Sequence, residues 1–203
     1  MAVRGVRPPK VNRRSAILKA AEKLMGSGGL SAVTTRQIAK EVGCSDSALY
    51  AHFEGRLELL LAMLEENLPD MRGPMQTLRE SVGQGSPQTN LALALDGIYT
   101  FHRRMTPQLA GLFAEPELLA AYRESLLQQK RGPHRGMKSI EDYIRAEQKL
   151  SRIGAQVDAR LAAYLLMSSS FFRAFSEHFA DGSTMPAWGK FAKQLVAAIV
   201  PGP

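Results

Sequence analysis

The segment from Thr34 to Ser45 constrains the fold more than any other, because it holds the start and end of one helix and the start of the next. Thr34, with Gln37 three residues later, predicts a capping box in which each side chain satisfies a backbone N–H at the helix start. Gly43 is a suitable end, since glycine adopts a left-handed conformation readily, and Ser45 then caps the second helix. Two short helices joined so closely predict a helix-turn-helix, with one face of the second helix outward.

The apolar residues around these caps predict a small helical head. Before the pair, they recur at helical spacing at Ile17, Ala21, Leu24 and Met25. Val33 and Ile38 occupy the two positions of a hydrophobic staple. Leu49 and Phe53 can point into the head. The outward side of the second helix then carries Asp46, Ser47, Ala48, Tyr50, Ala51 and His52.

This outward face has the chemistry of a DNA-reading helix. Small residues let a helix approach base edges, while Tyr50 and His52 can reach phosphates. Asp46 either caps the helix or accepts a hydrogen bond from a cytosine. Arg56 begins the next helix, where the helix dipole disfavours a cation unless a phosphate lies opposite. Many small helical domains contain such a corner without binding DNA, so the geometry alone leaves both interpretations open.

Positive charge is concentrated in the same part of the chain. The net charge is +7, and residues 1–60 hold ten cations against five anions. Such asymmetry suggests a polyanionic partner, although basic tails also serve solubility. Five of the cations, including Lys10 and Arg14, precede Ser15 among Pro and Gly residues. This arm is either a solvating tail or a segment that enters the flanking minor groove.

Over roughly residues 14–62, the chain resembles the N-terminal signature of the TetR family of transcriptional regulators. The matching residues are Thr34 to Ala39, Val42, Gly43, Ser45, Ala48 to Tyr50, His52, Phe53, Leu57, Leu59 and Leu60. The resemblance places Thr35 and Arg36 near phosphates. The family usually has lysine at the position of Arg56, and arginine keeps the charge. The DNA-binding residues we predict are Lys10, Arg14, Thr34, Thr35, Arg36, Ser45, Ser47, Ala48, Tyr50, His52 and Arg56.

The remainder of the chain predicts further helices and no strand, so we expect an all-α fold. The expected helices are Arg56–Leu68, Leu91–Met105, a short one after Pro107, Pro116–Lys130, Met137–Leu150, Asp158–Ala180 and Pro186–Val200. Residues 72–90 are rich in Gly, Pro, Ser and Gln and predict a poorly ordered connection or a loose helix end. We therefore divide the chain into an arm (1–14), a DNA-binding domain (15–60) and an effector-binding and dimerisation domain (61–203).

The stretch Leu161–Phe172 is apolar or small on every face, so we expect it to be buried all round. In TetR-like proteins the last two long helices pair with their copies, whereas in a monomer they would complete the core. Two arguments favour a homodimer: the Ser168-Ser169-Ser170 step permits close helix approach, and a single short recognition helix reads too little DNA. Twofold pairing would place two such helices about 34–36 Å apart. The interface residues we predict are Ser168, Ser169, Phe172, Phe191, Leu195 and Ile199.

The resemblance also implies an effector cavity among the body helices. Its candidate lining is Phe101, His102, Met105, Phe113, Tyr122, Tyr143, Tyr164, Met167 and Phe171. Aromatic and methionine residues at helical spacing equally form ordinary core. A mostly apolar cavity would suit a hydrophobic or aromatic ligand. His102 either donates a hydrogen bond to that ligand or is a satisfied buried histidine.

Other classes of function find little support in the residues. The chain has no Gly-x-Ser-x-Gly elbow, P-loop or Rossmann fingerprint. The four histidines lack metal-ligand spacing, and Cys44 is the single cysteine. We therefore expect no catalysis, cofactor or metal. We also expect no membrane span, since the longest apolar run, Leu161–Phe172, is shorter than the ~20 residues a bilayer requires. The plain expectation is a cytoplasmic protein.

We therefore expect a sequence-specific regulator, a repressor that a small apolar effector releases from operator DNA. Helix Arg56–Leu68 would act as the lever between body and head. The alternatives are an activator with the same head, a non-specific nucleic-acid or membrane-binding module, and an enzyme whose catalytic residues come together only in the folded chain.

Overall fold

The computed structural model describes residues 13–66, 69–180 and 185–202, and within these ranges it contains helices and no strand. The all-α prediction is confirmed. The head contains α1 (Arg13–Gly28), the 3-10 turn η1 (Leu30–Ala32), α2 (Thr35–Val42), α3 (Asp46–Tyr50) and α4 (Arg56–Glu66). The body contains α5 (Pro69–Glu80), α6 (Pro87–Phe113), α7 (Pro116–Gln128), α8 (Pro133–Lys149), α9 (Ala159–Ser176) and α10 (Trp188–Ile199).

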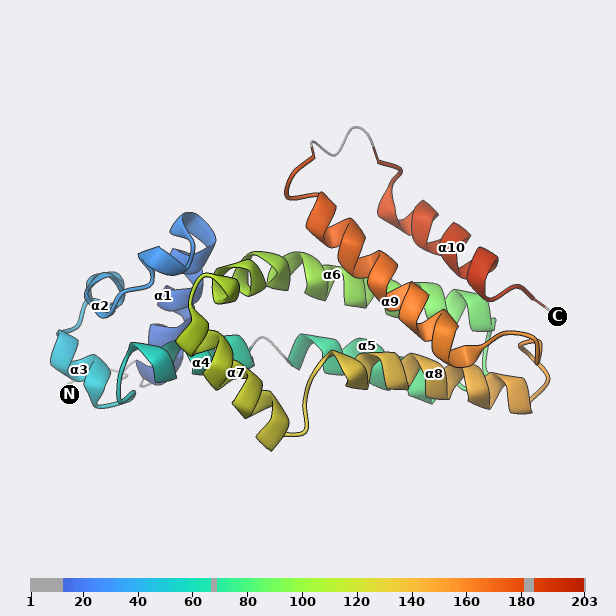
Figure 1. Ribbon diagram of the computed structural model, residues 1–203, viewed down its shortest axis with the longest axis horizontal. Helices are drawn as coiled ribbons and strands as arrows, with labels where there is room; N and C mark the ends of the chain where they lie inside the picture. The colour runs from blue at the N-terminus through green and yellow to red at the C-terminus, as the bar shows by residue number, and fades with distance from the viewer. Residues whose placement is uncertain (1–12, 67–68, 181–184, 203) are drawn as a thin grey trace, which may run out of the picture.

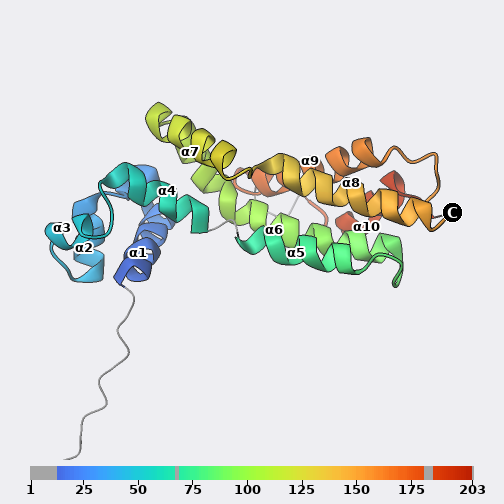
Figure 2. The same cartoon turned by 90° about the horizontal axis from the view of Figure 1, so that it is seen from below.

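The molecule is elongated, with α2 and α3 at one end and the C-terminal part of α10 near the other (Figure 1). Helix α6 runs along the body and joins its two ends. Helix α9 packs against α6 and α8, and α10 packs against α6 and α9. The view from below separates the head from the layered body helices (Figure 2). Among the described residues, no helix combines the length and apolarity needed to cross a bilayer.

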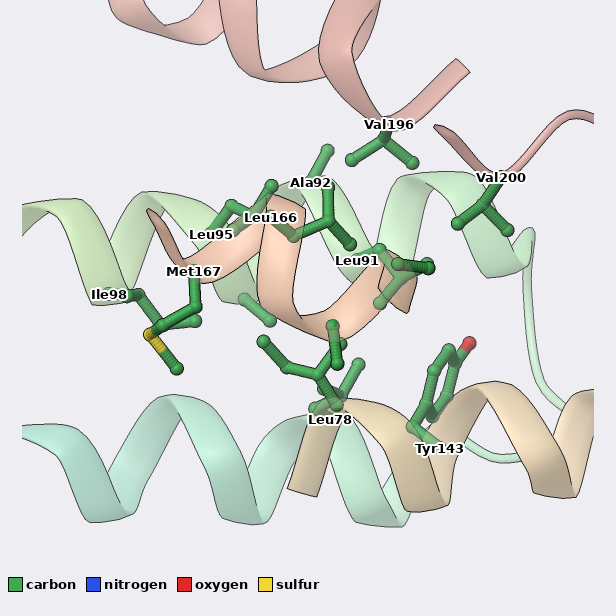
Figure 3. Close-up of a cluster of buried hydrophobic side chains, with 14 of the residues drawn as sticks. Leu78, Leu91, Ala92, Leu95, Ile98, Tyr143, Leu166, Met167, Val196 and Val200 are labelled. Carbon is green, nitrogen blue, oxygen red and sulfur yellow. The ribbon is translucent and has the colours of Figure 1, made fainter. Parts of the chain in front are cut away.

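Two clusters of buried side chains hold the fold together. The body cluster, shown in Figure 3, joins α5, α6, α8, α9 and α10 through residues such as Leu78, Leu95, Tyr143, Leu166 and Val196. The head cluster holds the predicted core of α1 to α4, but it also takes in Leu112, Leu118 and Tyr122 from α6 and α7. The boundary we placed at residues 60 and 61 therefore does not separate two hydrophobic cores.

Helix α6 is continuous through Pro107, where we expected a break. Proline has no N–H, so the carbonyl of Arg103, four residues earlier, loses its helical partner. His178, near the end of α9, places its Nε2 3.3 Å from that carbonyl oxygen. A side chain from the turn that follows α9 thus offers a donor where the proline removed one, and this compensation is not visible in the local sequence.

Helix α5 occupies part of the segment that we expected to be poorly ordered, and it contains Pro74. The proline side chain faces Gly97 of α6, whose missing side chain gives it room. At the preceding helix, α4 ends at Glu66, and Leu68, our expected end, lies outside the described residues.

The arm that we assigned to residues 1–14 is shorter than expected, because α1 begins at Arg13. Arg14 is therefore helical, and its guanidinium carbon lies 5.2 Å from the centroid of the Phe53 ring. Lys10, the other predicted DNA contact from the arm, lies outside the described residues.

Helix α9 begins as predicted, with Asp158 accepting hydrogen bonds from the backbone N–H groups of Arg160 and Leu161 at 2.9 and 3.0 Å. The bond from Leu161 is the main reason why the pKa of Asp158 is lowered. The expectation that α9 is buried all round is wrong for a single chain. One face exposes Leu161, Tyr164, Leu165 and Phe172, and these four residues are called the α9 strip below.

Candidate nucleic-acid interface

The helix-turn-helix forms where the capping residues predicted it. Thr34 accepts a 3.2 Å hydrogen bond from the backbone N–H of Gln37. Gly43 ends α2 at φ 72° and ψ 39°, in the left-handed region. The capping box is only half formed, because the Gln37 side chain accepts from the Thr34 hydroxyl instead of reaching the Thr34 backbone. The backbone N–H of Thr34 donates instead to the carbonyl of Ala32.

Helix α3 is short and is anchored by its inner face. Leu49 and Phe53 are buried in the head cluster, as predicted. Ser45 occupies the N-cap position, but its side chain makes no capping hydrogen bond to the backbone. Its Oγ lies 2.8 Å from Oγ of Ser47 instead, so these two exposed hydroxyls form a hydrogen bond with each other.

The opposite face of the helix-turn-helix is open at the end of the molecule (Figure 1). The predicted DNA residues divide by exposure: Arg36, Ser45, Ser47, Tyr50 and His52 are exposed, whereas Thr34, Thr35 and Ala48 are half-buried. Tyr50 is 55% exposed although it is aromatic, which a purely structural role does not explain. Sequence reasoning missed Lys40, which is exposed on α2 and lies four residues after Arg36, on the same face.

Arg56 differs from the other predicted contacts, because its guanidinium bonds within the chain. Its Nε donates to the carbonyl of Val33 at 2.9 Å, and one terminal nitrogen donates to the carbonyl of Leu30 at 3.1 Å. Both terminal nitrogens donate to the carboxylate of Glu115, each at 2.7 Å. The cation at the start of α4 therefore has a partner without DNA, which our dipole argument did not anticipate.

The Arg56–Glu115 pair shifts the pKa of both groups. Hydrogen bonding to Glu115 raises the pKa of Arg56, and hydrogen bonding to Arg56 lowers the pKa of Glu115. Both side chains are about one third exposed, so solvent screens the attraction between them. The geometry is nevertheless the bidentate arrangement in which an arginine–carboxylate pair is strongest.

Other polar contacts join the head to the body at the same place. Arg104 of α6 pairs with Glu22 of α1 at 2.6 Å. Glu65 of α4 accepts hydrogen bonds from Ser125 and Gln129 of α7. The head is thus held by α6 and α7 on two sides, through α1 and through α4.

Comparison with known proteins agrees with this arrangement. Residues 17–63 match the family model described as "Bacterial regulatory proteins, tetR family". A putative TetR-family transcriptional regulator from Mesorhizobium loti superposes with a TM-score of 0.73 at 16% identity, over 92% of this chain and 94% of the other. The chain thus carries a TetR-type domain at residues 17–63, and its overall fold is that of the Mesorhizobium loti protein.

Two further proteins extend the comparison. The nucleoid occlusion factor SlmA of a Shewanella species is 27% identical over 143 residues, which is 61% of this chain and 73% of SlmA. SmeT, the repressor of a Stenotrophomonas maltophilia multidrug efflux pump, was solved as a triclosan complex. That complex superposes with a TM-score of 0.69 at 19% identity, over 93% of this chain and 91% of SmeT. Residues 17–63 are thus a TetR-type DNA-binding domain on a body with the fold of that family.

The structure does not bring the predicted effector residues of the body together. Phe113 is 74% exposed at the end of α6, and Tyr164 is 58% exposed on the α9 strip. Tyr122 belongs to the head cluster, whereas Tyr143 is buried in the body, with its hydroxyl 3.0 Å from the Asn90 amide nitrogen that donates to it. Met105 and Met167 are both buried. Spacing along single helices did not show which faces meet.

A subset of the effector residues does meet, around His102. Its ring lies 5.8 Å from Phe101 and 5.5 Å from Phe171 between centroids. Its Nδ1 is 3.1 Å from Oγ of the buried Ser170. Burial lowers the pKa of His102 to about 4, so the ring is neutral at pH 7. The side chain of His102 is thus buried and hydrogen-bonded within the chain, and a hydrogen bond from it to an effector stays a prediction.

A separate groove lies between α5 and α6, away from these residues. It encloses about 240 Å³ and is lined by Pro74, Thr77, Leu78, Ser81, Asn90, Leu93 and Ala94. None of the effector residues that we predicted is among them, and the sequence offered no signal for this groove.

The predicted dimer residues lie on two helices with different surroundings. On α9, Phe172 is 68% exposed, and Ser168 and Ser169 are half-buried. On α10, Phe191, Leu195 and Ile199 are half-buried and pack against the body cluster of their own chain. Within one chain, the open apolar surface therefore belongs to α9 more than to α10.

Proposed function

We propose that this protein is a transcriptional regulator that binds operator DNA as a homodimer through α2 and α3, and that a small, largely apolar effector releases it. The observation that carries the proposal is the outward face of the helix-turn-helix. There Arg36, Tyr50 and His52 are exposed together at one end of the molecule, while Leu49 and Phe53 fix the helix from below. Cations position such a domain on phosphates, and the short helix reads base edges.

Dimerisation supplies the second half of the DNA site. A five-residue recognition helix reads too few bases alone, and twofold pairing would place its copy one DNA turn away. The α9 strip supports this proposal, because a contiguous apolar surface on a helix is stabilised when a partner covers it. Ser168 and Ser169 would let two copies of α9 approach closely.

The effector class follows from the lining available in the body. The groove between α5 and α6 is mainly apolar, so it would take a small hydrophobic or aromatic molecule. The triclosan complex of SmeT supports the same class of ligand. We propose no catalytic role, since the family and the fold are those of regulators.

Fluorescence anisotropy with the DNA that flanks its own gene tests the proposal. The comparison is scrambled DNA of equal length, across a salt series. We expect a large preference for the native flank, which Tyr50→Ala reduces and a bound effector abolishes. Equal and steeply salt-dependent binding to both duplexes would support a non-specific basic protein instead, provided that a genome-wide selection of bound fragments also finds no preferred sequence. An effector that binds tightly and leaves operator affinity unchanged would overturn the release model.

A second candidate function is that of a nucleoid occlusion factor, the description of the SlmA relatives. The observation that favours it is the length of that match, which at 143 residues extends beyond the head. The selection of bound fragments separates the two functions. A regulator is expected to occupy few sites near promoters, whereas a nucleoid occlusion factor should occupy many sites spread over the chromosome.

A further inference from the structure

The guanidinium of Arg56 is almost saturated by partners within the chain. An arginine side chain has five N–H donors, and four of those of Arg56 point to Val33, Leu30 and the two oxygens of Glu115. A phosphate could reach only the remaining donor unless these bonds broke. The geometry therefore argues against the phosphate contact that the position in the motif suggests.

The partners of Arg56 come from both sides of the junction between head and body. Leu30 and Val33 lie in the turn before α2, and Arg56 itself begins α4. Glu115 is the residue directly before α7, at the end of the α6–α7 connection. One side chain thus ties the helix-turn-helix and α4 to the body.

The same junction is also tightly packed. A β-carbon added at Gly111, near the end of α6, would lie 3.1 Å from Cβ of Leu30. A shift of the α6 end toward the head would therefore press directly on the turn that Arg56 holds. The close contact with Gly111 and the hydrogen bonds of Arg56 therefore meet at Leu30.

We propose that Arg56 is a positioning residue, a latch between head and body, and that its pair with Glu115 sets the orientation in which the helix-turn-helix meets DNA. This inference rests on the proposed function, since it concerns how the head is held for DNA binding. It assigns Glu115, which no motif marks, a part in operator affinity. It also explains why this position carries arginine: a lysine is a point charge that serves a phosphate well, but it cannot make a bidentate pair and two carbonyl contacts at once.

Conservative substitutions separate a latch from a phosphate contact. Arg56→Lys keeps the charge and would preserve a phosphate contact, but it breaks the latch. Glu115→Gln leaves Arg56 intact but removes the charge and one of the two acceptor oxygens of the latch, so it weakens the latch and would free part of Arg56 for a phosphate. Glu141→Gln is the matched control, because it removes one negative charge from an i,i+4 pair with Arg145 on α8.

The full chain is titrated with the DNA flanking its own gene over a salt series. We expect Arg56→Lys and Glu115→Gln each to weaken binding about five- to tenfold with an unchanged salt slope, and the double variant to be no weaker than either. Glu141→Gln should bind as the unmodified chain does. The inference is overturned if Arg56→Lys binds normally, or if Glu115→Gln binds more tightly with a slope steeper by about one phosphate.

A second measurement does not depend on the operator. Cys44 is the single cysteine, it is half-buried, and it lies in the turn of the helix-turn-helix, so a spin label there reports the distance between the two heads of a dimer. A latch predicts a broader distance distribution in both latch variants and an unchanged one in Glu141→Gln. Unchanged distributions in all three would also overturn the inference. Failure of the unmodified chain to prefer its own DNA would instead count against the proposed function.

Discussion

Pro74 of α5 lies against Gly97 of α6 so closely that a β-carbon on the glycine would come within 2.3 Å of the proline Cγ. Neither residue type favours a helix interior, yet Pro74 lies inside α5 and Gly97 inside α6. The two exceptions compensate for each other, because the glycine leaves the space that the proline ring fills. The contact fixes the distance between α5 and α6 at the point where both enter the body core.

Gly97→Ala should therefore destabilise the protein although alanine is the better helix former. We expect a loss of about 1–3 kcal/mol in the free energy of unfolding, because the added methyl group overpacks the contact with Pro74. Chemical denaturation followed by circular dichroism measures it. Gly26→Ala is the matched control: Gly26 is an exposed helical glycine of α1 with open space around its added β-carbon, so the substitution should stabilise α1 by up to about 1 kcal/mol. Equal effects of the two substitutions would show that the contact does not constrain the helices.

His102 should make stability depend on pH between about 6.5 and 4. Its pKa in the folded chain is lowered to about 4 by burial, whereas the unfolded chain titrates near 6.5. The unfolded state therefore binds the proton first as the pH falls, and stability decreases over this range by about 3 kcal/mol. His102→Asn can keep the contact with Ser170 and should flatten the profile. An unchanged slope in that variant would exclude His102 as the titrating group.

Phe172→Arg should dissociate the dimer. The substitution places a charge in the α9 strip, where we expect the partner's apolar surface, so association should weaken at least tenfold. Sedimentation equilibrium measures the change. Phe113→Arg serves as the control, since Phe113 is still more exposed but lies on α6 outside the strip. Loss of the dimer in both variants would indicate a general effect of charge, and loss in neither would place the interface elsewhere.

Tyr50→Ala should lower operator affinity about tenfold and leave stability within about 0.5 kcal/mol, because the side chain is exposed and its proposed partner is a phosphate. Leu49→Ala, one position earlier, should instead act mainly on stability. It leaves a cavity in the head cluster and should reduce the free energy of unfolding by about 2–5 kcal/mol. A variant of Tyr50 that unfolds as readily as the Leu49 variant would contradict this division of roles.

The parts of the fold that were predictable depend on neighbours in the sequence. The caps at Thr34 and Gly43 act over four residues or fewer, so α2 could be placed from local chemistry alone. The continuity of α6 through Pro107 could not be predicted, because the histidine that compensates for it lies 71 positions later in the chain. The same reason explains Pro74, whose partner is in another helix.

The candidate site shows the same division. Tyr50 and Arg36 could be assigned to one exposed face, since a helix-turn-helix fixes the direction of its own side chains. Arg56 keeps the positive charge that the motif favours at this position, but its partner Glu115 is 59 positions away, and no local pattern connects them. For the effector residues, helical spacing gave the face of each helix but not the helix opposite, which is why Tyr122 and Tyr143 belong to different cores.

The head cluster has a consequence for how heads of this kind can be exchanged between proteins. The family signature ends at residue 63, whereas the buried cluster around it continues to Leu112, Leu118 and Tyr122. The segment that the family model matches is therefore smaller than the segment whose side chains form the buried cluster. A chimera that joins this head to a foreign body would inherit the DNA-reading surface but not its complete core, unless the new body supplied apolar residues at those three positions. An exchange of this head therefore requires a body whose residues at the positions of Leu112, Leu118 and Tyr122 pack against the head.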